Sequence, residues 1–507
     1  MSALALPQAA SVVQSVDWLA IAPPTIAAVV GLAVLVTDLF VDDRKKTLLG
    51  WLSVAGLAAA TLMLLPLLDG DRSTFCLTGD PRVCSYTADR FTLVIQLLVL
   101  GGALLTALLS VTALKDARGG LPEGEYWFLL LSSAAGAALL PASRDLATLI
   151  VALEVASLPA FALVGLRHGD RKSSEAALKF FLSSVTATAV SLMGISFVYA
   201  STGTLYLTQI AERIQNVDGQ LHTLTQTGVA LTLIGFAFKT AAVPFHFWVP
   251  DTYVGAPLPI AAYLSVVGKA VGFSGLVLVT VIALPSYADV WGPALAVLAA
   301  LTMTVGNAGA LRQRATRAYS AVRLLAWSSV GQAGYLLVPI AAAAYSDDAE
   351  HSVGSTVAYA LMYGAVNLGA FAVAALVGRT RLLNRVSDYR GLYATNPLTA
   401  LLLAFFLLCL AGLPPGIIGL FAKVTVFSAA VDAGLGWLAV VMAVNVVIAL
   451  YYYLQWTALL FRAPEGAPAA HRAPAPVTAA IALTAAVGIA LSGAPQLVLR
   501  FADTSLF

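Results

Sequence analysis

Long apolar runs separated by short polar loops dominate this sequence. A helix needs about 20 consecutive apolar residues to cross the hydrocarbon core of a bilayer. Runs of about that length occur at 19–40, 47–68, 91–113, 125–141, 145–166, 174–201, 224–250, 257–284, 290–311, 322–344, 354–378, 397–430, 434–461 and 474–499. The pattern predicts an all-α integral membrane protein with about fourteen transmembrane helices in one polytopic domain, residues 1–507. The longest polar interruption, residues 203–223, is expected to hold a short surface helix.

Proline interrupts two of these predicted helices close to a lysine. Lys239 precedes Pro244, and Lys423 follows Pro414 and Pro415. Proline removes a backbone donor and clashes with the preceding turn, so both helices should be broken. Paired broken helices in corresponding positions indicate inverted repeats. We therefore predict two inverted five-helix repeats, helices 4–8 and helices 9–13, each with one broken helix. The predicted parts of the domain are helices 1–3 (1–120), the first repeat (121–285), the second repeat (286–462) and helix 14 (463–507).

The composition agrees with a membrane protein and excludes nucleic-acid binding on electrostatic grounds. Hydrophobic residues make up 60% of the chain and charged residues 11%, whereas soluble domains carry about 25% charged residues. The formal net charge of +2 leaves no basic excess to neutralise phosphates. The first sixteen residues contain no Lys or Arg, so the positive region of a signal peptide is missing. The first helix is expected to insert uncleaved.

The distribution of positive charge predicts how the bundle is oriented. The loops on one side of the predicted bundle carry eighteen Lys and Arg residues in total, and the loops on the other side carry six. Cytoplasmic loops are the ones enriched in these residues. The loop from Arg379 to Arg390 then lies inside, and both termini lie on the periplasmic or outer side of a bacterial inner membrane.

Three cysteines give no basis for a metal site. Cys409 lies in an apolar run and is expected to be a small core residue. Cys76 and Cys84 share one polar loop at a spacing that fits no common zinc pattern. A disulfide between them is expected only if the loop faces an oxidising compartment.

The remaining four positive charges lie within predicted helices, and all four are lysines: Lys179, Lys239, Lys269 and Lys423. Burial lowers the pKa of a lysine towards neutrality, whereas arginine stays charged. An ionisable residue inside a membrane helix is a functional candidate by default. Two alternatives involve no proton transfer. Lys179, near a helix end, would extend to the membrane interface, and the deeper lysines would form structural ion pairs. Glu154, in the middle of its run, is the obvious partner.

Six motifs in the same order resemble the proton-conducting membrane subunits of complex I, a superfamily that also includes Mrp-type sodium/proton antiporters. They lie at 154–159, 239–251, 255–257 together with Lys269, 323–329, 388–392 and 410–415. Lysine at 269 and 423, and a chain of this length, resemble the antiporter-like N-type subunit.

The resemblance implies a proton path. Glu154 and Lys239 would form an ion pair, and Lys269 and Lys423 would continue a polar axis through the middle of the membrane. Accessory positions would be Lys179, His246, Gln332, Ser328 and Asp388. Relatives often carry a histidine where this chain has Gln332, and an amide cannot titrate.

The function implied is proton translocation as a non-redox subunit of a proton-pumping NADH–quinone oxidoreductase. Flavin, iron–sulfur clusters and quinone would lie in partner subunits, and this chain would hold no cofactor. Its partners would be other membrane-arm subunits, including the M-type antiporter-like subunit and small membrane subunits. The alternatives are an Mrp-type antiporter subunit, a stand-alone secondary transporter and a non-conducting assembly subunit.

Overall fold

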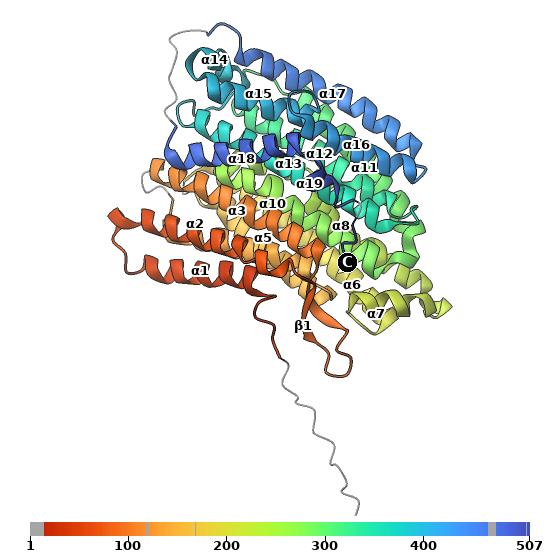
Figure 1. Ribbon diagram of the computed structural model, residues 1–507. Coiled ribbons are helices and arrows are strands. Elements are labelled where there is room, and N and C mark those ends of the chain that lie inside the picture. The colour runs from red at the N-terminus through yellow and green to blue at the C-terminus, as the bar shows by residue number, and fades with distance from the viewer. Residues whose placement is uncertain (1–14, 118–120, 168, 465–472, 503) are drawn as a thin grey trace, which may run out of the picture.

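The computed structural model describes residues 15–117, 121–167, 169–464, 473–502 and 504–507. Its helices lie side by side in one bundle, with α1 and α2 at one edge and α15–α17 at the opposite edge (Figure 1). The α-helices are α1 (Ala22–Asp38), α2 (Thr47–Leu62), α3 (Arg90–Asp116), α4 (Glu123–Leu139), α5 (Leu146–Gly165), α6 (Arg171–Thr202), α7 (Leu207–Arg213), α8 (His222–Thr240), α9 (Val249–Gly255), α10 (Leu258–Val277), α11 (Ala288–Leu311), α12 (Ser320–Ala342), α13 (Ala349–Gly378), α14 (Leu392–Thr395), α15 (Pro397–Ala411), α16 (Ile417–Asp432), α17 (Gly436–Leu460), α18 (Ala475–Gly493) and α19 (Gln496–Leu499). Shorter 3-10 segments are η1 (Asp43–Lys45), η2 (Leu65–Leu67), η3 (Leu140–Ala142), η4 (Ile214–Asn216), η5 (Gly219–Leu221), η7 (Pro285–Tyr287) and η8 (Val386–Tyr389), and a π-helical segment, η6 (Leu278–Ala283), extends α10.

Helix starts follow the local sequence. The side chain of Asp89 accepts a hydrogen bond from the Thr92 backbone N–H at 2.9 Å and caps α3. Asp145 caps α5 in the same way through the N–H of Thr148, at 2.8 Å. Such caps satisfy backbone donors that have no partner within the helix.

The predicted all-α membrane fold is confirmed. Within the described residues, eleven helices are long and apolar enough to cross a membrane, and α1 and α15 are shorter apolar helices. The polar interruption at 203–223 contains α7, the short helix expected there. The count of fourteen, the inverted repeats and the division into parts stay predictions, and Arg118 and Arg472, two of the charges counted inside, lie outside the described residues.

Both helices that carry proline next to a lysine are broken, as predicted. The first ends at Thr240, where Ala241 adopts a left-handed conformation with φ of 67°, and resumes as α9 at Val249. The second ends as α15 at Ala411, where Gly412 has φ of 86°, and resumes as α16 at Ile417. Each break lies beside the lysine identified from the sequence.

A small hairpin and the C-terminal residues lie at one end of the bundle. Strands β1 (Arg72–Cys76) and β2 (Cys84–Ala88) pair antiparallel, with Cys76 opposite Cys84, and a disulfide joins these two cysteines. Near the start of the described chain, Asp17 forms an ion pair with Arg72 at 3.0 Å. Near its end, the Leu506 carbonyl accepts from the N–H of Phe91 at 3.0 Å, at the start of α3. Both described ends therefore lie on the same side of the bundle.

Candidate functional site

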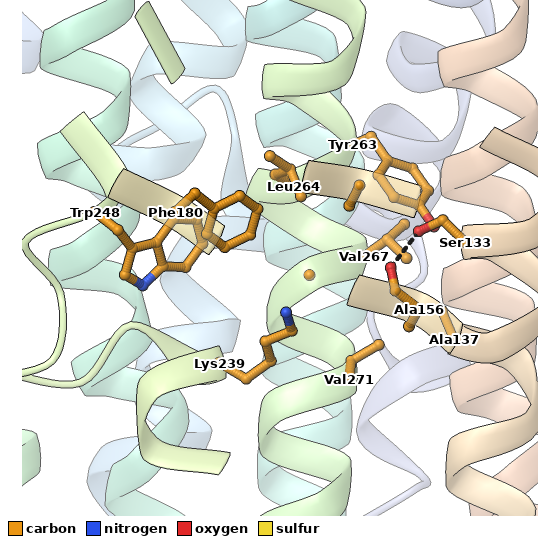
Figure 2. Close-up of a pocket in the computed structure, with 12 residues that line it drawn as sticks. Ser133, Ala137, Ala156, Phe180, Lys239, Trp248, Tyr263, Leu264, Val267 and Val271 are labelled. Atoms are coloured by element: carbon orange, nitrogen blue, oxygen red, sulfur yellow. Dashed lines mark hydrogen bonds between the residues drawn. The ribbon is translucent and has the colours of Figure 1, made fainter. Parts of the chain in front are cut away.

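Lys239 lies in the last turn of α8, where the broken helix leaves its side chain inside the bundle. The residue is 5% exposed, and its Nζ has no hydrogen-bond partner among the described residues. It points into a small cavity of about 10 Å³, bounded by α4, α5, α6, α8 and α10 (Figure 2). The residues that line the cavity include Ser133, Phe180, Trp248, Tyr263 and Gly268.

The far wall of this cavity is polar. The Tyr263 hydroxyl and Ser133 Oγ are 2.9 Å apart, and Ser133 donates to the carbonyl oxygen of Ala156 at 2.6 Å. Figure 2 shows this pair across the cavity from Lys239. Hydroxyl groups both donate and accept hydrogen bonds, so this wall offers partners to water or to a proton in the cavity.

Glu154 does not form the expected ion pair with Lys239 in this conformation. Its Oε1 accepts a hydrogen bond from the Thr188 hydroxyl at 2.7 Å, between α5 and α6. The Lys239 ammonium instead lies 5.2 Å from the ring centroids of Phe161 and Phe180. In place of the ion pair, the carboxylate of Glu154 is satisfied by a hydroxyl, and the ammonium of Lys239 faces aromatic rings.

Lys269 occupies the middle of α10 and is 2% exposed. Its Nζ donates to the backbone carbonyl of Ser329 and, at 2.6 Å, to Ser329 Oγ on α12. Ser329 Oγ lies 2.9 Å from the hydroxyl of Tyr363 on α13. Lys269 is thus held by neutral groups, and the hydrogen bonds lead from it towards α13.

Gln332 lies at the centre of a second group of hydroxyls. Its amide oxygen accepts from Tyr359, and its amide nitrogen donates to the hydroxyl of Tyr453 at 3.3 Å. The Tyr453 hydroxyl is also hydrogen-bonded to Ser328 Oγ. The accessory positions Ser328 and Gln332 therefore share one network, in which two tyrosines surround the amide.

Lys423 lies in the second turn of α16 and is 5% exposed. Its Nζ donates to the carbonyl oxygens of Leu410 and Ala411 at 3.0 and 2.6 Å, at the C-terminal end of α15. Unpaired carbonyls at that end carry partial negative charge, which favours a cation. Lys423 lines a small cavity of about 10 Å³ together with Gln332, Tyr359 and Tyr363.

The other accessory positions lie apart from this network. Lys179 is half exposed and forms ion pairs with Glu175 at 2.7 Å and Asp251 at 2.9 Å, and Asp251 also pairs with Arg323 at 3.3 Å. This cluster ties α6 to α9 and α12.

His246 and Asp388 have other surroundings. The ring of His246, between α8 and α9, lies 5.5 Å from that of Trp327. Asp388 accepts from the backbone N–H of Arg385 at 2.7 Å and caps η8, a local role that needs no proton transfer.

The sequence reasoning missed the aromatic and hydroxyl residues that surround the lysines. They are Ser133, Phe161, Phe180, Thr188, Tyr263, Tyr359, Tyr363 and Tyr453. The tyrosines carried a signal, because a tyrosine hydroxyl within an apolar helix needs a partner when it is buried. The phenylalanines carried none, since a phenylalanine in a membrane helix is ordinary.

Comparison with known proteins places these features in a family. Residues 143–449 match the family model described as NADH:quinone oxidoreductase/Mrp antiporter, transmembrane. The chain is 75% identical to NADH-quinone oxidoreductase subunit N 2 of Streptomyces griseus, over 98% of this chain and 96% of that protein.

Solved structures share the fold. A chain of respiratory complex I from Thermus thermophilus, solved with bound aureothin, superposes with a TM-score of 0.75 at 31% identity, covering 94% of this chain and 98% of that one. A chain of the Mrp complex from a Dietzia species gives a TM-score of 0.81 at 22% identity, covering 96% of both chains. The second likeness concerns the fold alone.

Proposed function

This chain belongs to the NADH:quinone oxidoreductase/Mrp antiporter transmembrane family, and on that premise we propose that it carries protons across the membrane as the N-type subunit of a proton-pumping NADH–quinone oxidoreductase. Proton transfer would use Glu154, Lys239, Lys269 and Lys423. Redox chemistry would occur in partner subunits that hold flavin, iron–sulfur clusters and quinone, and the M-type subunit would be one neighbour in the membrane arm.

The observation that carries this proposal is the environment of three buried lysines. Lys239 has no hydrogen-bond partner among the described residues, Lys269 bonds to a serine and Lys423 to backbone carbonyls. A buried charge that served only packing would be expected to have an opposite charge beside it, because burying an unpaired ion is costly. Lysines held by neutral groups are able to exist with or without the proton.

Hydroxyl groups and cavities support transfer between these lysines. Ser329 connects Lys269 to Tyr363, and Tyr363 lines the cavity that reaches Lys423. On the other side, Gly268 and Tyr263 of α10 line the cavity of Lys239. Serine and tyrosine hydroxyls relay protons without holding a net charge, since each both donates and accepts.

The identity of the relatives favours complex I over the Mrp alternative. The Streptomyces relative is 75% identical and is named as an NADH-quinone oxidoreductase subunit, whereas the Mrp chain shares 22% identity. A stand-alone transporter would function without partners, which offers a simple further distinction.

Lys423→Met and Lys239→Met test the proposal. Methionine has a similar length and cannot hold a proton, so NADH-driven proton uptake in membrane vesicles should fall by at least about tenfold per assembled complex. Lys45→Met, at an exposed lysine of η1, is the matched control and should pump normally. Wild-type uptake in both core variants would contradict proton transfer through this chain.

A further inference from the structure

The ammonium of Lys239 lies in a corner formed by two aromatic rings. Its Nζ is 5.2 Å from the centroid of Phe161 on α5 and 5.2 Å from that of Phe180 on α6. The two rings meet edge to face, with centroids 4.6 Å apart and planes at 87°. A cation within about 6 Å of a ring centroid is attracted by the negative face of the ring.

The rings of this corner are fixed in place. Phe161 is 5% exposed and Phe180 is 1% exposed. Trp248, just before α9, stacks on Phe180 with centroids 4.3 Å apart and planes at 11° (Figure 2). Because both rings are buried and packed, their positions relative to α5 and α6 are well defined.

We propose that Phe161 and Phe180 form an aromatic cage that holds the protonated side chain of Lys239 when it is separated from Glu154. The proposal rests on the proton-carrying function proposed above and assigns positioning residues to it. The rings supply the attraction that the absent hydrogen bonds do not, and cation–π contacts are strongest at desolvated sites such as this one.

The same pair of helices carries both partners of the lysine. Phe161 follows Glu154 by seven residues on α5, and Phe180 precedes Thr188 by eight residues on α6. At 1.5 Å per residue, the cage and the carboxylate are roughly 10–12 Å apart along the helices. Lys239 therefore has two sites along one interface, the cage that it occupies here and the carboxylate held by Thr188.

Fluorinated phenylalanines at position 180, and separately at position 161, provide the test in the assembled complex. Each added fluorine weakens the negative face of the ring with little change in shape. Quinone reductase activity and NADH-driven proton uptake should both fall stepwise with the number of fluorines, by about threefold to thirtyfold for the trifluorinated ring. A merely structural ring would give no such graded loss.

Phe181 is the matched control. It is the next residue on α6, its ring lies 5.8 Å from Phe161, and its side chain is 40% exposed. Fluorination there should leave activity unchanged. Equal activity across the series at 161 and 180 would overturn the cage, and so would an equal graded loss at 181. If Lys239→Met abolishes pumping while the series has no effect, the proposed function stands and the cage alone fails.

Discussion

The three central lysines share a residue type but have different surroundings. Lys239 faces two aromatic rings, Lys269 bonds to Ser329, and Lys423 bonds to backbone carbonyls at a helix end. Rings, a hydroxyl and carbonyls stabilise an ammonium to different extents, and all remain neutral when the proton leaves. This variety suits a path in which a proton moves between unequal sites.

Glu154→Gln tests whether the carboxylate takes part in that movement. At an effective dielectric of 20, moving an opposite charge from 4 Å to 8 Å weakens its attraction by roughly 2 kcal/mol. Removing the charge should therefore slow coupled turnover by up to about thirtyfold, while glutamine still accepts the hydrogen bond from Thr188. Quinone reductase activity and proton uptake of the assembled variant, measured across pH, provide the check.

Thr188→Val separates the charge of Glu154 from its hydrogen bond. The carboxylate stays and loses its hydrogen bond from the hydroxyl at 2.7 Å, so turnover should change less than in Glu154→Gln.

For Glu154→Gln itself, normal turnover with an unchanged pH profile would show that the carboxylate has a purely structural role.

At the scale of elements, the two broken helices use their breaks differently. The first leaves a gap of several residues between α8 and α9, and its lysine projects into a cavity. The second has a tight break, and α16 packs directly on the end of α15. Gly412 ends α15 in a left-handed conformation, and a Cβ at this position would lie 3.3 Å from Lys423 Nζ.

Gly419→Ala tests the close packing of α16 on the end of α15. A Cβ at position 419 would overlap the carbonyl oxygen of Cys409 on α15, so α16 must move away and carry Lys423 from its carbonyl partners. Overpacking of this kind costs about 1–3 kcal/mol. Thermal unfolding of the purified complex should occur at lower temperature, and proton uptake per complex should fall.

Gly101→Ala in α3 is the control for that substitution, because a Cβ there meets nothing within 4 Å. Equal behaviour of the two variants would show that the contact of α15 with α16 does not hold Lys423 in place.

At the scale of the whole molecule, both described ends of the chain lie on the same side of the bundle. The ion pair between Asp17 and Arg72 and the hydrogen bond between Phe91 and Leu506 lie at that side, as does the disulfide-linked hairpin. Which compartment this side faces stays a prediction from the charges of the loops.

Labelling with an impermeant thiol reagent tests that orientation. In a chain whose three cysteines are replaced, Leu382→Cys lies in the loop after α13, where the side chain is 80% exposed, and Gly79→Cys lies in the hairpin loop. Intact cells should label only Gly79→Cys, and inverted vesicles only Leu382→Cys. The reverse pattern would show that the bundle has the opposite orientation in the membrane.

The sequence by itself determined the class of protein, the broken helices and the identity of the central lysines. These are local properties: the length of an apolar run decides whether a helix can span a bilayer, and proline favours a break because it lacks a backbone donor and clashes with the preceding turn. A lysine within such a run is visible without any knowledge of packing. Lys239, Lys269 and Lys423 were found in this way.

Only the tertiary structure decided what each lysine contacts. The partners of Lys239 come from α5 and α6, and those of Lys269 and Lys423 from α12 and α15. Helices that are apolar on all sides carry no periodic signal for the face that turns inward, so their rotations, and hence these contacts, follow from packing alone. For that reason the sequence led to an ion pair between Glu154 and Lys239, whereas the fold brings a hydroxyl to one and two phenylalanine rings to the other.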